Sequence, residues 1–170
     1  VGDYIAQMKS GKINANAAPS VMSQSPSYLH VSADNGFAYP ALDLAIDQAV
    51  QMAATTGCVA IAVSQSNHCG TLASHVEKLA MQGLIGIMVA NTPAAIAPWG
   101  GNKPLYGTNP IAFAAPRVGQ DPLVIDLSLS VVARGKVMNA KKTFLWATDP
   151  EMRKDLFERR ELFMRELVYS

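Results

Sequence analysis

Residues 57–71 read GCVAIAVSQSNHCGT, which is an apolar run followed by a polar loop and then by the start of a helical pattern. The run 58–63 is short, wholly apolar and rich in β-branched residues, which predicts a strand buried on both faces. Gly57, just before it, is a typical stop for a preceding helix. A strand that leads through a polar loop into a helix is the basic unit of an α/β domain.

The flanking segments extend this pattern in both directions. Apolar residues at helical spacing predict helices over 40–56 and 71–82, ended by Gly57 and Gly83, and a shorter helix over 3–10, ended by Gly11. Further strands are expected at 85–90, 111–114 and 123–125, the first of them buried, and a short one is possible at 28–31 within a polar stretch, 12–30. Residues 32–36 form a predicted turn, and 130–140 a predicted helix.

Two segments differ from the rest. Residues 91–107 are rich in proline and glycine, and a loop this long inside a compact domain is usually functional. From about residue 141 the composition shifts, and 149–169 is a charged run with a sparse apolar stripe, which predicts an amphipathic helix. We therefore predict a partial α/β domain over 1–140 and a charged helical tail over 141–170.

Composition excludes several classes of protein. The chain has 170 residues, 49% of them hydrophobic, and a net charge of +1, which gives no electrostatic case for nucleic acid or an anionic membrane. Cys58 and Cys69 fit no disulfide framework, which favours the cytoplasm. The apolar stretch 84–90 is too short to span a bilayer. Because a helical pattern begins at once after Val1, we expect further residues upstream.

The loop after the apolar run is the first candidate site. The N–H groups of a helix that starts at Gly70 and Thr71 would attract a cofactor phosphate or a substrate carboxylate, and His68 could donate a hydrogen bond or a proton. The alternative is that Ser66 and Asn67 cap the helix and His68 is an ordinary loop residue.

Two other strand ends are weaker candidates. In residues 107–110 (GTNP), Thr108 and Asn109 either face a ligand or form a tight turn. In residues 126–130 (DLSLS), Asp126 either accepts a hydrogen bond from a cofactor, or it or Ser128 caps the next helix. The sequence contains no Gly-x-Gly-x-x-Gly motif after a strand, no phosphate loop of the GKS/T type, no Gly-x-Ser-x-Gly elbow and no metal-ligand spacing.

Six short motifs occur in a characteristic order: SNHCG (66–70), GLIGI (83–87), APWGG (97–101), GTNPIAF (107–113), IDL (125–127) and ARGK (133–136). In this order the chain resembles the malate/L-lactate dehydrogenase family over about residues 1–140. That family also includes sulfolactate, ureidoglycolate and 2,3-diketogulonate enzymes and piperideine-carboxylate reductase.

The resemblance implies a homodimeric α/β fold that binds NAD or NADP in a non-Rossmann manner, here incomplete and with an added C-terminal helix. It implies hydride transfer at a small 2-hydroxy or 2-keto acid. By the same resemblance, His68, Cys69, Gly70, Thr71 and Leu72 form a cofactor-binding loop, Thr108 contacts substrate, and Asp126, Leu127 and Ser128 lie on a second cofactor-binding strand end. The family's proton-donating histidine lies in a Ser-His-Gly-x-x-Arg motif upstream of Val1, so no catalytic residue is expected in this chain.

Three functions therefore remain open from the sequence. The first is an NAD(P)-dependent oxidoreductase of which this chain is a part. The second is a truncated, non-catalytic homologue that binds a nucleotide or a carboxylate. The third is an interaction protein whose helical tail docks on a partner.

Overall fold

The computed structural model describes residues 2–130, which fall into two compact units. Among the described residues, the first unit comprises residues 2–87 and 112–125, and the second comprises residues 88–111 and 126–130. The helices predicted over 130–140 and 149–169, and the boundary predicted after residue 140, lie outside the described residues.

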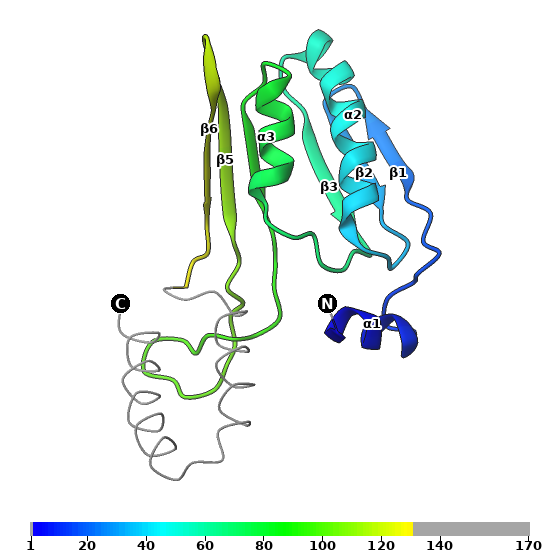
Figure 1. The fold of residues 1–170 in the computed structure, drawn as a ribbon, viewed down its shortest axis with the longest axis vertical. Helices are drawn as coiled ribbons and strands as arrows, with labels where there is room; N and C mark the ends of the chain where they lie inside the picture. Colours follow the sequence, from blue (N-terminus) through cyan, green and yellow to red (C-terminus); the bar gives the residue numbers. More distant parts are fainter. Residues whose placement is uncertain (1, 131–170) are drawn as a thin grey trace. The chain divides into compact units, whose positions relative to one another are not determined.

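The described chain contains both helices and strands, and the last three strands follow one another without a helix between them (Figure 1). In order they are α1 (Gly2–Lys9), β1 (Ser20–Ser25), β2 (Tyr28–Ser32), α2 (Ala38–Thr56), β3 (Ala60–Ser64), α3 (Ala73–Met81), β4 (Gly86–Val89), β5 (Ile111–Arg117) and β6 (Gln120–Leu127). The α/β class predicted from the sequence is confirmed.

The first sheet has the strand order β1-β2-β3. β1 pairs antiparallel with β2, and β2 pairs parallel with β3 through the crossover helix α2, which makes a βαβ unit. Figure 1 shows α2 lying along this sheet. The core between them is formed by every second residue from β2 and the position just after it, packed against one face of α2. The strand side contributes Leu29, Val31 and Ala33, and the helix contributes Ala41 and Ala45.

The three helices begin or end within three residues of the predicted positions. α2 ends at Thr56, and Gly57 adopts a left-handed φ of 74° while its N–H bonds the Ala53 carbonyl oxygen at 2.9 Å. α3 begins at Ala73, two residues later than predicted, so Gly70 and Thr71 belong to the preceding loop. That shift matters for the site described below.

The prediction for residues 12–30 was wrong in one respect, because it missed β1. This strand has the sequence SVMSQS and is exposed along its whole length. Its own residues carry no apolar alternation, so pairing with β2 rather than burial makes it a strand.

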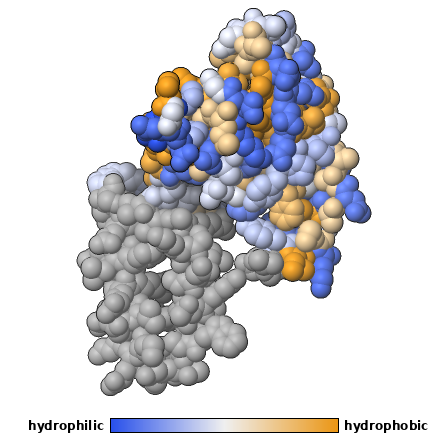
Figure 2. All heavy atoms as spheres, turned by 45° about the horizontal axis from the view of Figure 1, so that its top comes forward, coloured by the Kyte–Doolittle hydropathy of each residue, from blue (hydrophilic) through white to orange (hydrophobic). Residues whose placement is uncertain are grey.

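The prediction that two strands are buried on both faces was also wrong. β3 is exposed or half-buried throughout, and Ile87 and Val89 of β4 are 71% and 69% exposed. In the second sheet, of order β4-β5-β6, Leu123, Ile125 and Leu127 of β6 are exposed at every second position. Figure 2 shows apolar side chains at the surface among hydrophilic ones. An apolar run indicates that a strand favours burial, but whether both of its faces are covered depends on the rest of the fold.

The strands predicted at 28–31, 111–114 and 123–125 are confirmed as β2, β5 and β6, the last two longer than predicted. The proline-rich segment 91–107 forms neither a helix nor a strand. An isolated bridge closes part of it, because the N–H of Ile96 bonds the Tyr106 carbonyl oxygen at 2.8 Å and the N–H of Tyr106 bonds the Ile96 carbonyl oxygen at 2.9 Å. None of the helices described in residues 2–130 has the length and apolar character needed to cross a membrane.

Candidate functional site

The first candidate site is the loop that joins the carboxyl end of β3 to α3. Asn67 connects the first half of this loop to the turn before α2 through hydrogen bonds. The Asn67 N–H donates to the Gly36 carbonyl oxygen at 2.9 Å, and its side-chain amide donates to the Asn35 carbonyl oxygen at 2.7 Å. The alternative that Ser66 and Asn67 cap the helix is therefore wrong, since the N-cap residue is Leu72, which makes no side-chain cap hydrogen bond.

His68 is exposed on this loop, where its imidazole stacks on the ring of Tyr4 from α1. The ring centroids are 5.0 Å apart and the planes differ by 22°. Partial burial lowers the pKa of His68 below its ordinary value of 6.5. At neutral pH the ring is therefore uncharged, and it can donate one hydrogen bond and accept another.

A side chain at position 70 would be strained by the backbone and would overlap Tyr39 unless Tyr39 moved. Its φ is +74°, and a Cβ added there would lie 2.5 Å from the Tyr39 hydroxyl oxygen. Tyr39 belongs to the first turn of α2, and burial raises its pKa, with smaller contributions from Cys69 and Tyr4. The phenol therefore stays protonated at neutral pH, beside the backbone of the loop.

Several backbone donors in this loop have no acceptor in the part of the chain that the structure describes. Within residues 2–130, the backbone N–H groups of Gly70, Thr71 and Leu72 donate no hydrogen bond. These residues lead directly into α3, whose N-terminal dipole is positive. Consecutive unpaired N–H groups at a helix start are suited to binding a phosphate or a carboxylate.

The side chains of this segment differ in exposure. Thr71 is exposed, Cys69 is half-buried, and Leu72 is buried, with 2% of the residue exposed. Leu72 therefore presents almost no surface to a ligand, and the accessible part of the segment is formed by the residues before it. The predicted residues His68, Cys69, Gly70, Thr71 and Leu72 lie together in one segment.

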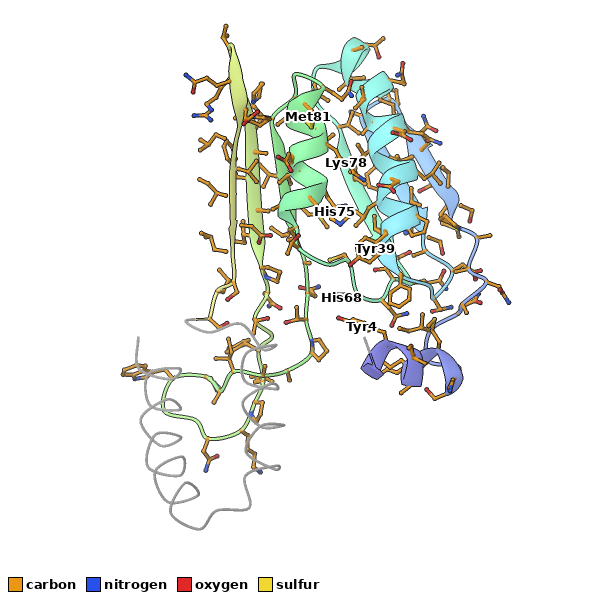
Figure 3. The ribbon with its side chains drawn as sticks, viewed as in Figure 1. Tyr4, Tyr39, His68, His75, Lys78 and Met81 are labelled. Carbon is orange, nitrogen blue, oxygen red and sulfur yellow. The ribbon has the colours of Figure 1, made fainter. Side chains whose placement is uncertain are left out.

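Sequence reasoning missed the residues that surround this loop. An unbroken series of ring contacts runs from His68 to Tyr4, Phe37, Tyr39 and His75, with centroid distances between 5.0 and 6.5 Å. Figure 3 shows four of them, Tyr4 and His68 near α1 and Tyr39 and His75 between α2 and α3. Their spacing in the sequence matches no motif, because they come from three helices and two loops.

The second candidate site lies in the other unit, at the GTNP segment. The Thr92 hydroxyl oxygen accepts the N–H of Thr108 at 2.7 Å and that of Asn109 at 3.3 Å, and lies 3.1 Å from the Thr108 hydroxyl oxygen. The side-chain carbonyl of Asn109 accepts the Thr92 N–H at 3.0 Å. Thr108 is 9% exposed, so its hydroxyl is committed largely to this internal network. Thr92 was missed because it stands alone in the long loop.

The third candidate, the end of β6, lies beside the second within the same unit. Asp126 and Leu127 are exposed, and the Leu129 N–H donates to the Thr108 carbonyl oxygen at 2.9 Å. The Ser128 hydroxyl donates to the Ser130 carbonyl oxygen at 2.7 Å. The structure thus brings Thr108 next to Leu129, one residue beyond the segment 126–128. The helix that Asp126 or Ser128 was expected to cap lies outside the described residues.

A hollow of about 620 Å³ lies between α2 and α3, away from these loops. The Asp43–Lys78 ion pair bridges the two helices there. None of the predicted site residues lines it. Within residues 2–130, no group of three His, Cys, Asp or Glu side chains is placed to hold a metal ion.

A family model described as malate/L-lactate dehydrogenase matches residues 1–144. The chain belongs to the malate/L-lactate dehydrogenase family. The resemblance seen in the six motifs is thereby confirmed.

Several relatives in this family can be compared directly. The chain is 50% identical over 155 residues to a (2R)-3-sulfolactate dehydrogenase (NADP(+)) of Chromohalobacter salexigens, which covers 88% of this chain and 46% of that protein. It is 39% identical over 139 residues to a Delta(1)-pyrroline-2-carboxylate/Delta(1)-piperideine-2-carboxylate reductase of Pseudomonas putida, with coverage of 82% and 41%. The chain spans less than half the length of these curated relatives.

Solved structures of the family share the fold. A delta1-piperideine-2-carboxylate reductase from Pseudomonas syringae superposes with a TM-score of 0.79 at 37% identity, over 84% of this chain and 43% of that one. A sulfolactate dehydrogenase from Methanocaldococcus jannaschii gives a TM-score of 0.73 at 31% identity, over 82% and 40%.

Proposed function

We propose that this chain carries the cofactor-binding loop of an NADP-dependent oxidoreductase that interconverts a small 2-hydroxy acid and the corresponding 2-keto acid. The observation that carries the proposal is the run of backbone N–H groups at Gly70, Thr71 and Leu72 without acceptors among the described residues. A dinucleotide provides phosphates for such donors, and family membership makes a nicotinamide dinucleotide the ligand to test.

The residues of the loop fit this ligand. Gly70 has no side chain to obstruct an approach to the backbone, and the exposed His68 and Thr71 can add hydrogen bonds to phosphate or ribose oxygens. The low pKa of His68 makes this contact an uncharged one at neutral pH, so the positive field comes from the backbone. The named cofactor of the sulfolactate dehydrogenase relative supports NADP over NAD.

The second unit holds the remaining predicted site residues. We assign Thr108 as a substrate contact held in place by Thr92, and Asp126, Leu127 and Ser128 as a second cofactor contact. The bound nicotinamide supplies or accepts the hydride. The carbonyl oxygen also needs a proton donor within hydrogen-bond reach, and we assign that role to a histidine outside this chain.

Two broader assignments follow from the resemblance to the family. We propose that the protein works in the cytoplasm as a homodimer. The exposed apolar residues of β4 and β6 support a further contact surface, because single-chain proteins rarely leave such a row uncovered.

Fluorescence titration with NADPH and NADH tests the binding proposal. Wild type should bind NADPH more tightly than NADH, and His68→Ala should weaken NADPH binding by about tenfold, equivalent to about 1.4 kcal/mol. His30→Ala is the matched control, because His30 is half-buried on β2 and lies outside the loop. Absence of binding to either cofactor would overturn the proposal.

Turnover is tested separately, by loss of NADPH absorbance with 3-sulfopyruvate, pyruvate, oxaloacetate and a cyclic 2-imino acid. The proposal expects 3-sulfopyruvate to be reduced fastest when the catalytic histidine is present on a longer chain. Binding without turnover on any chain length would favour the non-catalytic homologue instead.

A further inference from the structure

His75 is a buried histidine at the start of α3 that the family resemblance does not place in the site. It is 3% exposed, and its Nε2 lies 2.7 Å from the Cys69 carbonyl oxygen. Because a carbonyl can only accept, Nε2 carries the proton and donates it to this bond. The other ring nitrogen, Nδ1, has no hydrogen-bond partner within residues 2–130. The bond to Cys69 is thus the polar contact that orients the ring.

This bond sets the direction of the next backbone donor. The peptide between Cys69 and Gly70 is trans, so its C=O and N–H point in opposite directions. With the carbonyl directed inward to His75, the N–H of Gly70 is directed away from the buried ring. Gly70 is the first of the three donors that have no acceptor among the described residues.

Tyr39 restricts the same peptide from a second side. Its hydroxyl oxygen would lie 2.5 Å from a Cβ at Gly70, and its ring centroid is 5.9 Å from that of His75. Figure 3 shows Tyr39 and His75 next to each other between α2 and α3. The loop backbone is therefore held by a hydrogen bond from His75 and by contact with Tyr39.

We propose that His75 is a positioning residue for the loop 68–72, and that its hydrogen bond to the Cys69 carbonyl keeps the Gly70 N–H turned toward a bound anionic group. This inference rests on the proposed function for the identity of the anion. A side chain needed only to fill space could be apolar. A phenylalanine of similar shape would fill the same space but would donate no hydrogen bond to the Cys69 carbonyl. Loss of that bond therefore distinguishes a positioning role from a space-filling one.

The decisive variants differ by one methylene. In His75→Gln the amide nitrogen reaches the position of the imidazole Nε2 and preserves the bond. In His75→Asn the amide reaches only the position of Nδ1 and loses the bond. His75→Phe removes the donor while keeping the shape. Val76→Ala is the control, because it removes two methyl groups from a buried residue in the same turn of α3 without removing the bond.

Two readouts are needed, measured on the full chain. The first is the backbone amide resonance of Gly70 in the cofactor-free protein, and the second is the dissociation constant for NADPH. We expect His75→Asn and His75→Phe to displace the Gly70 resonance and to weaken NADPH binding by about tenfold or more. His75→Gln should keep the wild-type resonance and bind within about threefold of wild type. Val76→Ala should lower only the melting temperature.

Each other outcome is informative. A Gly70 resonance unchanged in both Asn and Phe variants overturns the positioning role, whether or not the protein binds NADPH. A displaced resonance with unchanged NADPH affinity overturns its link to the cofactor. If wild type binds no NADPH, the proposed function fails, and so does the part of the inference that names a bound anion. The Gly70 resonance still decides whether His75 positions the loop.

Discussion

The imidazole of His68 stacks on the phenol ring of Tyr4 with ring centroids 5.0 Å apart and planes only 22° from parallel. The two residues are 64 positions apart, and the contact joins α1 to the loop before α3. It covers one face of an otherwise exposed imidazole. The electrostatic character of His68 thus depends on a residue of α1 that is far away in the sequence.

Removal of this cover should raise the pKa of His68. In Tyr4→Ala the ring gains water, so the pKa should rise toward 6.5. The imidazole proton shifts in an NMR pH titration would measure it. Tyr28→Ala on β2 is the control and should leave the titration of His68 as it is. An unaltered pKa in Tyr4→Ala would show that other atoms bury the ring.

The lowered pKa of His68 also predicts how stability depends on pH. On acidification the unfolded chain binds a proton at His68 first, since its pKa there is near 6.5 and the folded value is lower. The free energy of unfolding should therefore fall as pH drops below 6.5 through the folded pKa. Urea unfolding at about pH 7.5 and about pH 5.5 would measure the loss, which His68→Gln should reduce. An equal loss in His68→Gln would assign it to other groups.

Gly70→Ala should destabilise the protein more than the same change at Gly57. Both glycines have φ of +74°, but an added Cβ meets nothing within 4 Å at Gly57 and meets Tyr39 at Gly70. Each change costs about 1–2 kcal/mol for the left-handed backbone. Gly70→Ala should cost about 1–3 kcal/mol more for the overlap. Denaturant unfolding checks the difference, and Tyr39→Ala should remove most of it when combined with Gly70→Ala.

The threonine network should be more sensitive at Thr92 than at Thr108. Thr92→Val leaves the N–H of Thr108 without its acceptor at 2.7 Å, so we expect a loss of about 1–3 kcal/mol. Thr108→Val removes one hydroxyl contact and should cost about 0.5–1.5 kcal/mol. Thr92→Ser keeps the hydroxyl as a control. A larger loss at Thr108 in the absence of ligand would contradict this order.

Much of the fold was predictable because local patterns dominate it. α2 has apolar residues at helical spacing and a glycine placed to end it, and the structure confirms both. β1 could not be predicted, since its polar residues form a strand only through pairing with β2. The exposure of β4 could not be predicted either, because burial depends on neighbours far away in the sequence.

The same distinction between local patterns and long-range contacts applies to the candidate site. The sequence by itself determined the family, the loop motif 66–70 and the glycine at its end, since these are contiguous motifs whose chemistry is local. The tertiary structure alone decided that α3 begins at Ala73, that Tyr4 covers His68, and that Tyr39 and His75 hold the peptide before Gly70. These contacts join residues from two other helices to one loop, and packing of the whole unit, rather than any local pattern, brings them together.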